Sequence, residues 1–399
     1  LVQGDVGTGK TVLAALAALC CVEAVYQVAL MSRTELLAEQ HLGNLAAWLT
    51  PLGIQPGWLS VRHKGRRRET TLQGLADGSI ELVVGTHALF QEDVAFDRLG
   101  LVIVDEQHRF GVHQRLALRE KGADAQVPHQ LVMTATPIPR TLAMTAYADL
   151  DLSVIDELPP GRRPVSTVVV ADRRREQVVE RVAGACREGR QAYWVCTLIE
   201  ESEALQAQAA EDTAAALAEV LDGLKVGLVH GRLKAAEKET VMAAFKAGEI
   251  DLLVATTVIE VGVDVPNASL MVIDNAERLG LSQLHQLRGR VGRGAQQSHC
   301  VLLYRPPLGG VAQERLAVMR ETGDGFEIAR RDLEIRGPGE VLGTRQTGEM
   351  QFRIADLLRD QDLVPGVQVL ADRLLAEHPV CVAPLIHRWI GRKVQYADV

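Results

Sequence analysis

The stretch Gly4-Asp5-Val6-Gly7-Thr8-Gly9-Lys10-Thr11 decides the fold, because a glycine, four residues, a second glycine, Lys and Thr is the spacing of a phosphate-binding loop. Backbone N–H groups of such a loop wrap an anionic phosphate at the start of a helix. We expect Lys10 to reach the terminal phosphates and the Thr11 hydroxyl to ligate Mg²⁺. The stretch predicts a nucleotide site formed by Gly4, Asp5, Val6, Gly7, Thr8, Gly9, Lys10 and Thr11.

An acidic motif, Asp105-Glu106-Gln107-His108, follows the apolar run Leu101-Val102-Ile103-Val104. The run is typical of a short buried strand, which would deliver Asp105 to the same Mg²⁺. Glu106 is then placed to orient and deprotonate an attacking water. A glycine-rich turn alone is a weak signal, but the two motifs together predict nucleotide hydrolysis.

Length and composition indicate a folded protein of two or three domains, because 399 residues exceed one ordinary core. The net charge of −8 argues against a uniformly basic nucleic-acid coat, so DNA binding would use the basic runs 62–68, 173–175 and 330–331. The alternative for each run is an ordinary solvated surface. The six cysteines include no CxxC pair, which indicates reduced cytosolic thiols and no metal site.

Residues 12–31 are apolar enough to suggest a membrane span. A buried helix followed by a strand explains them better, because they start directly after the phosphate-binding loop. The chain shows no signal peptide and opens on Leu1 rather than Met. We expect it to begin inside the strand that leads into the loop.

Apolar runs alternate with helical patterns along the chain, which predicts an α/β fold with two tandem parallel-sheet domains. Residues 158–164, rich in Pro and Gly, indicate a linker, and 200–221 an exposed helix. After Pro306-Pro307 come a charged helical segment and a glycine-rich loop at 337–348. We expect the nucleotide in the cleft between the domains. The predicted strands are 25–30, 80–84, 101–104 and 130–133, then 165–170, 192–196, 226–230, 252–256, 270–273 and 299–304.

Two further motifs point to the cleft. Thr134-Ala135-Thr136-Pro137 ends a strand beside the acidic motif, where the Thr134 and Thr136 hydroxyls would couple phosphate state to domain movement; a plain strand terminus is the alternative. In Gln286-Leu287-Arg288-Gly289-Arg290-Val291-Gly292-Arg293, the guanidiniums of Arg290 and Arg293 would meet phosphate oxygens across the cleft. A surface basic cluster would not need glycines at fixed spacing. Residues 253–264 end a strand with polar groups that would face nucleotide and nucleic acid.

These four motifs, in this order over residues 1–304, resemble the core of superfamily 2 helicases and translocases. The resemblance implies two RecA-like domains that close on ATP and Mg²⁺ while stepping along nucleic acid. It implies a catalytic set of Lys10, Glu106, Arg290 and Arg293, and Gln286 as a further nucleotide contact. By motif position, it also implies DNA-backbone contacts at Thr34, Thr86 and His87.

Longer strings at 105–111, 134–142, 281–290 and 332–348 are similar to the RecG family and its relative Mfd. The last string resembles a RecG translocation element, for which a passive connector is the alternative. The resemblance implies that Arg315, Arg336 and Gln346 couple domain closure to DNA movement. The implied parts are RecA-like domains at 1–157 and 158–306, a hairpin and loop at 307–350, and a C-terminal extension packing on the motor at 351–399.

This resemblance implies a monomeric bacterial protein of the cytoplasm and nucleoid that remodels stalled forks and Holliday junctions. Its partners would be branched double-stranded DNA and a single-strand-binding protein, with no membrane. Arg33 departs from the usual Pro of the family, and the family's N-terminal wedge domain is not among these 399 residues. Alternatives are an Mfd-like repair-coupling translocase, a non-hydrolysing DNA-binding scaffold and a small-molecule P-loop kinase. The last is disfavoured because it needs no second α/β unit.

Overall fold

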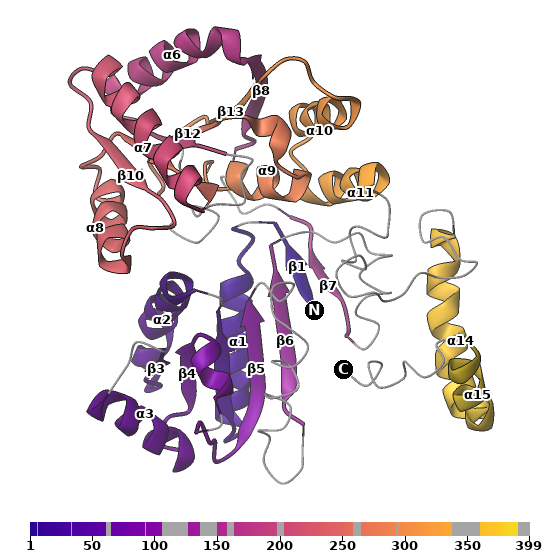
Figure 1. Cartoon of the computed structure of the whole chain (residues 1–399). Helices are drawn as coiled ribbons and strands as arrows, with labels where there is room; N and C mark the ends of the chain where they lie inside the picture. The colour runs from indigo at the N-terminus through magenta and orange to yellow at the C-terminus, as the bar shows by residue number, and fades with distance from the viewer. Residues whose placement is uncertain are drawn as a thin grey trace.

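A computed structural model describes most of the chain (Figure 1). The described residues are 1–5, 7–32, 34–60, 65–91, 93–105, 127–135, 150–157, 163–197, 203–257, 265–292, 294, 296–336 and 360–389. Two α/β domains lie one above the other in Figure 1, and a separate helical pair stands beside them.

The first domain is built on a seven-stranded parallel sheet with the order β3-β4-β2-β5-β6-β1-β7. Its central strands are buried on both faces, as expected where helices cover a parallel sheet on both sides. The strands are β1 (Val2–Gly4), β2 (Gln27–Met31), β3 (Gly57–Leu59), β4 (Leu82–Gly85), β5 (Leu99–Asp105), β6 (His129–Thr134) and β7 (Ser153–Ile155).

Helices α1 (Lys10–Glu23) and α2 (Glu35–Leu49) share a hydrophobic core with one face of this sheet. Helix α3 (Arg66–Ala76) and the short η2 (His87–Phe90) pack on the opposite face. One further turn of 3₁₀ helix, η1 (Thr50–Leu52), follows α2. The predicted helix and strand at 12–31 are therefore α1 and β2, and no described helix is long and apolar enough to cross a membrane.

The second domain has a six-stranded parallel sheet with the order β10-β11-β9-β12-β13-β8. Helices α6 and α7 cover one face, and α8 to α11 cover the other. The strands are β8 (Ser166–Ala171), β9 (Gln191–Val195), β10 (Val226–Val229), β11 (Leu252–Ala255), β12 (Ala268–Ile273) and β13 (His299–Tyr304). The helices are η5 (Asp172–Arg174), α6 (Arg175–Arg187), α7 (Glu203–Val220), α8 (Ala235–Lys246), η7 (Ala276–Arg278), α9 (Leu281–Arg288), α10 (Gly310–Glu321) and α11 (Gly325–Arg336).

The α10–α11 hairpin belongs to the second domain by its packing. Leu316, Met319 and Ile328 lie in the same buried cluster as Leu284 and Leu287 of α9. The proposed boundary after residue 306 therefore separates segments that share one core. By contrast, Figure 1 shows α14 (Val364–Glu377) and α15 (Pro379–Trp389) standing apart from both sheets. The short η8 (Gln361–Leu363) directly precedes α14. Packing of residues 351–399 on the motor stays a prediction.

Both domains contain the same buried hydrogen-bond arrangement, made by a glutamine side chain at the start of a strand. Gln27 begins β2, and its Nε2 donates to the carbonyls of Leu75 (2.9 Å) and Ile80 (2.8 Å), at the end of α3 and the start of the following segment. Gln191 begins β9 and donates to Phe245 (2.6 Å) and Ile250 (2.7 Å) in the same way after α8. Each amide thus donates to two carbonyls where a helix turns back into the sheet.

The expectation of two parallel-sheet domains is confirmed, because every predicted strand overlaps an observed one. Short strands β3 and β7 were missed, since three residues give too little pattern. The prediction of an exposed helix at 200–221 was partly wrong. Helix α7 forms there, but Ala207, Ala210, Ala214 and Leu217 are buried against the sheet, because alanine leaves room for close approach.

Three of the six cysteines are buried in the second domain and pack as small apolar residues. Burial raises the pKa of the Cys300 thiol to about 12 and that of Cys186 to about 11. Because the thiolate is the reactive form, both thiols are unreactive at neutral pH.

Replacing Gln191 with Leu tests the buried amide. The substitution keeps the volume but removes the side-chain donor from the buried Ile250 carbonyl, at a cost of about 1–3 kcal/mol, while the Phe245 carbonyl keeps the Gly248 N–H at 3.1 Å. We expect the free energy of unfolding of the second domain to fall accordingly in urea titrations followed by fluorescence. Gln208→Leu on the exposed face of α7 is the matched control, with an effect within about 0.5 kcal/mol. Equal effects of the two substitutions would contradict the assignment.

Candidate nucleotide site between the two domains

The phosphate-binding loop joins β1 to α1, and its glycines adopt conformations that other residues avoid. Gly7 has φ 85° and Gly9 has φ 90°, and Gly9 caps the start of α1. A Cβ on Gly4 would lie 2.5 Å from Thr8 Oγ1, which itself donates to the Asp5 carbonyl at 2.9 Å. The loop thus needs glycine at these positions, and the N-terminus of α1 opens toward it.

Lys10 is the first residue of α1 and is 9% exposed. Its Nζ donates to the carbonyls of Gly4 and Asp5, both at 2.8 Å, so the ammonium is held over the loop. Thr11 follows in the first helical turn, where its hydroxyl lies at the same end of α1. Val6 lies outside the described residues.

Three neighbouring strands bring the predicted motifs to one edge of the sheet. Asp105 ends β5 in register with Met133 of β6, and Thr134 ends β6 in register with Gln3 of β1. Because these strands are parallel, Asp105, Thr134 and Gly4 lie at the same edge. Carboxylate and hydroxyl oxygens are the ligands that Mg²⁺ prefers, so Asp105 and Thr11 fit such an ion. Glu106 lies outside the described residues.

His41 belongs to this site although no sequence motif pointed to it. His41, buried on α2, places Nε2 2.8 Å from Asp105 Oδ2. Their side chains are only 9% and 15% exposed, so the contact is shielded from solvent. A histidine inside a helix carries no local signal of such a partner. The geometry makes His41 a group that orients the carboxylate expected to hold Mg²⁺.

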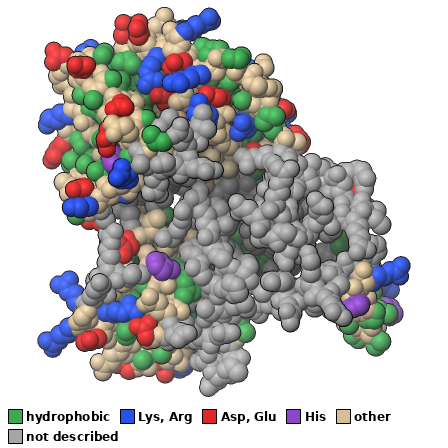
Figure 2. Space-filling view, in the orientation of Figure 1, with side chains coloured by type: hydrophobic (Ala, Val, Ile, Leu, Met, Phe, Trp, Pro, Cys, Tyr) green, Lys and Arg blue, Asp and Glu red, His purple; other side chains and the backbone are tan. Residues whose placement is uncertain are grey.

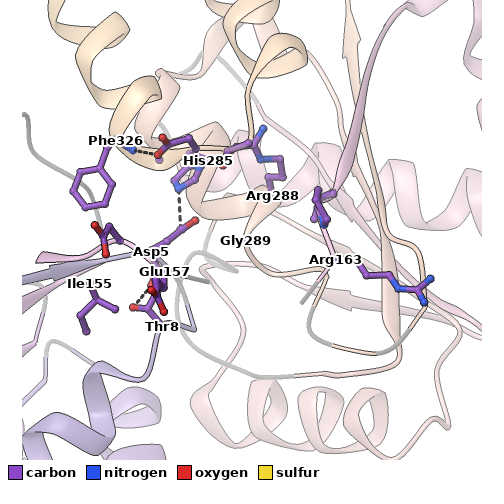
Figure 3. Close-up of a pocket in the computed structure, with 15 residues that line it drawn as sticks. Asp5, Thr8, Ile155, Glu157, Arg163, His285, Arg288, Gly289 and Phe326 are labelled. Atoms are coloured by element: carbon purple, nitrogen blue, oxygen red, sulfur yellow. Dashed lines mark hydrogen bonds and ion pairs between the residues drawn. The ribbon is translucent and has the colours of Figure 1, made fainter. Parts of the chain in front are cut away.

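The second domain faces this loop across a cavity of about 440 Å³. Its lining includes Asp5 and Thr8 of the first domain, His285, Arg288 and Gly289 of the second, and the turn before α11 (Figure 3). His285 Nε2 reaches across to Asp5 Oδ1 at 3.0 Å. Sequence reasoning selected the motif but not this histidine.

The residues expected to contact nucleotide from the second domain lie on the same segment. Gln286 belongs to α9, Arg290 follows it, and both are half-buried. Arg293 lies outside the described residues. Contact of Gln286 and Arg290 with a nucleotide stays a prediction, since neither is among the residues that line the cavity.

The threonines expected to contact DNA occupy different environments. Thr34 caps α2 by accepting from Leu37 N–H at 3.3 Å, which leaves its own hydroxyl proton available. Thr86 is 2% exposed with Oγ1 enclosed, so a backbone contact there needs local opening; His87 beside it is exposed. Thr134 is also buried, and Thr136 lies outside the described residues.

Of the three coupling residues, only Arg315 has a described side chain. It donates to the carbonyls of Leu279 (2.7 Å) and Glu277 (3.2 Å), which ties α10 to the segment leading into α9. This position suits a mechanical role better than direct DNA contact. The Arg336 side chain and Gln346 lie outside the described residues.

Each basic run contributes at least one described arginine that pairs with a carboxylate. Arg175 lies 2.7 Å from Asp274 and stacks 4.9 Å over Trp194, while Arg330 pairs with Glu327 and Glu334 on its own helix. Arg68 pairs with Asp93 at 2.7 Å. Figure 2 shows positive and negative side chains interspersed over the described second domain. An ordinary paired surface accounts for Arg68, Arg175 and Arg330, and DNA binding by the basic runs stays a prediction.

A phosphate-binding loop on one parallel-sheet domain, facing an arginine-bearing helix on a second, defines a two-domain P-loop fold of the helicase type. The chain matches three family descriptions: DEAD/DEAH box helicase at 1–145, helicase conserved C-terminal domain at 175–295, and ATP-dependent DNA helicase RecG, domain 3, C-terminal, at 322–392. The chain belongs to the RecG family of ATP-dependent DNA helicases.

Curated relatives named ATP-dependent DNA helicase RecG cover the whole chain. The protein of Escherichia coli K12 is 64% identical over 400 residues and that of Pasteurella multocida 63% over 401 residues. The chain spans 58% of the length of each. This membership favours RecG over the Mfd-like alternative.

Solved structures agree with the fold. One described as RecG bound to a three-way DNA junction has a TM-score of 0.72 and 46% identity, covering 91% of this chain and 47% of that one. Dbp5 of Saccharomyces cerevisiae bound to RNA and ADP BeF3 has a TM-score of 0.57 at 16% identity, covering 87% of this chain and 88% of its own, and shows the shared fold alone.

His41→Asn tests whether His41 orients a metal-binding carboxylate. Removing Nε2 frees Asp105, so the Mg²⁺ concentration for half-maximal binding of a fluorescent ATP analogue should rise by about tenfold or more. Binding without Mg²⁺ should change little. His129→Asn, an exposed histidine at the opposite end of β6, is the control. An unchanged Mg²⁺ dependence would remove His41 from this role.

Proposed function

We propose that this chain is the motor of an ATP-dependent double-strand DNA translocase that remodels branched DNA, namely stalled forks and Holliday junctions. The observation that carries the proposal is the arrangement of the phosphate-binding loop and the α9 segment on opposite sides of one interdomain cavity. The RecG relative bound to a three-way junction supports branched DNA as the substrate class.

The chemistry follows from residue types. Loop N–H groups and Lys10 would bind the ATP phosphates, while Thr11 and Asp105 would hold Mg²⁺, which lowers the barrier by neutralising charge on the phosphates. Glu106 would take a proton from the attacking water. Arg290 and Arg293 would stabilise charge in the transition state, with Gln286 as a further nucleotide contact.

The wider setting is part of the same proposal. The protein would act as a cytoplasmic, nucleoid-associated monomer, with a single-strand-binding protein as a partner. Thr34, His87 and Thr86 would contact the DNA backbone, Thr134 and Thr136 would link hydrolysis to closure, and Arg315, Arg336 and Gln346 would convert closure into movement. The non-hydrolysing scaffold is disfavoured, because Glu106 and both arginines are present.

Glu106→Gln separates binding from hydrolysis. The amide keeps the size but cannot accept the water proton, so kcat should fall by about 10²-fold or more, within the range of general-base catalysis. Affinity for ATP and Mg²⁺ should stay close to that of the unchanged protein. Steady-state ATPase on branched DNA and nucleotide binding measure the two quantities. Near-normal turnover would assign the base to another residue.

Arg290→Ala should lower kcat far more than ATP affinity, by about 10³-fold, because an arginine finger acts mainly on transition-state charge. Exposed Arg187→Ala on α6 is the control. The same ATPase assay and a fork-binding titration decide the question. Loss of DNA binding with unchanged kcat would make Arg290 a nucleic-acid contact instead.

A further inference from the structure

A continuous chain of hydrogen bonds runs from the phosphate-binding loop to the α10–α11 hairpin. Asp5 Oδ1 lies 3.0 Å from His285 Nε2, and His285 Nδ1 lies 3.0 Å from an Arg288 guanidinium nitrogen. Arg288 in turn donates to the carbonyls of Met319 (3.1 Å), Thr322 (2.8 Å) and Gly323 (3.1 Å). Figure 3 shows His285 pointing from α9 toward Asp5.

Arg288 determines the direction of these bonds. A guanidinium has donors only and stays charged, so His285 Nδ1 must accept. The imidazole is therefore the neutral form with its proton on Nε2, which donates to the Asp5 carboxylate. Each ring nitrogen of His285 has a defined role, and the ring orientation is set from within the second domain.

The far end of this chain is rigid. Arg288 and His285 are each 4% exposed, and the guanidinium satisfies three carbonyls at the end of α10 and in the turn that follows. The C-terminus of a helix carries partial negative charge, which favours a cation there. Leu284 and Leu287 of α9 also share a core with Met319 and Ile328 of the hairpin. Helix α9 and the hairpin should therefore move as one body.

We propose that His285 is a positioning residue that links the phosphate-binding loop to the α10–α11 hairpin, with Arg288 holding its ring in the orientation that reaches Asp5. This inference rests on the proposed function, since the link can transmit the nucleotide state to the hairpin only if the loop binds ATP. A change in the loop, or in the separation of the domains, then acts on α9 through His285 and on the hairpin through Arg288.

The link makes a thermodynamic prediction. A translocase grips DNA in one nucleotide state and releases it in another, so a non-hydrolysable ATP analogue must change the Kd for fork DNA. His285→Asn keeps an oxygen near Nδ1 for Arg288 but cannot reach Asp5. In this variant the fork-DNA Kd values measured with and without the ATP analogue should become nearly equal, so their ratio approaches one. The effect of the analogue on DNA affinity should thus shrink by about fivefold or more.

His285→Gln is the rescue variant, because its amide nitrogen replaces Nε2 and can still donate to Asp5. It should retain most of the ratio. Exposed His378→Asn is the control, and a thermal melt of each variant in the intact protein reports folding. If His285 has only a structural role, both His285→Asn and His285→Gln should lower the melting temperature while the ratio of the two Kd values for fork DNA is unchanged.

The possible results distinguish a failure of the proposed function from a failure of the His285 link. If the unchanged protein binds neither ATP nor fork DNA, or if the ATP analogue leaves its Kd for fork DNA unchanged, the proposed function fails. If the unchanged protein shows the ratio and His285→Asn keeps it, the link is overturned while the proposed function stands. Loss of the ratio in Asn with retention in Gln supports the link.

Discussion

The structure depends on the parallel pairing of β1, a strand of only three residues, between β6 and β7. Val2 pairs with Met133 on one side and with Ser153 on the other. This pairing fixes where the phosphate-binding loop leaves the sheet and sets it one strand away from β6 and two from β5. Since all these strands end at one edge, Asp105 and the loop share a site although about a hundred residues separate them.

The two domains repeat an architecture but divide the chemistry. Gln27 and Gln191 do the same structural work at the start of equivalent strands, which indicates a common plan. The loop glycines, Lys10 and Asp105 belong to the first domain, and α9 with Arg290 to the second. In the proposed mechanism, hydrolysis uses both sets and so depends on the contact between the domains, where the Asp5–His285 bond lies.

Charge is used locally in this protein. The net charge is −8, and several of the described arginines meet carboxylates or carbonyls: Arg175 with Asp274, Arg288 with the end of α10, and Arg315 with the segment before α9. A guanidinium holds several acceptors in fixed geometry, so each such arginine ties two elements together. In this region arginine joins α9, α10 and the turn before α11 into one mechanical unit.

The sequence by itself determined the two parallel sheets, the order of the motifs and the edge at which they meet, because apolar runs and glycine spacings are local patterns. It did not determine which side chains touch across the fold. His41 meets Asp105 from 64 residues away and His285 meets Asp5 from 280. Burial of Thr86 and of one face of α7 was likewise decided by packing. A histidine or threonine has the same local pattern whether it is solvated or enclosed, so only the tertiary structure supplies its partner and its role.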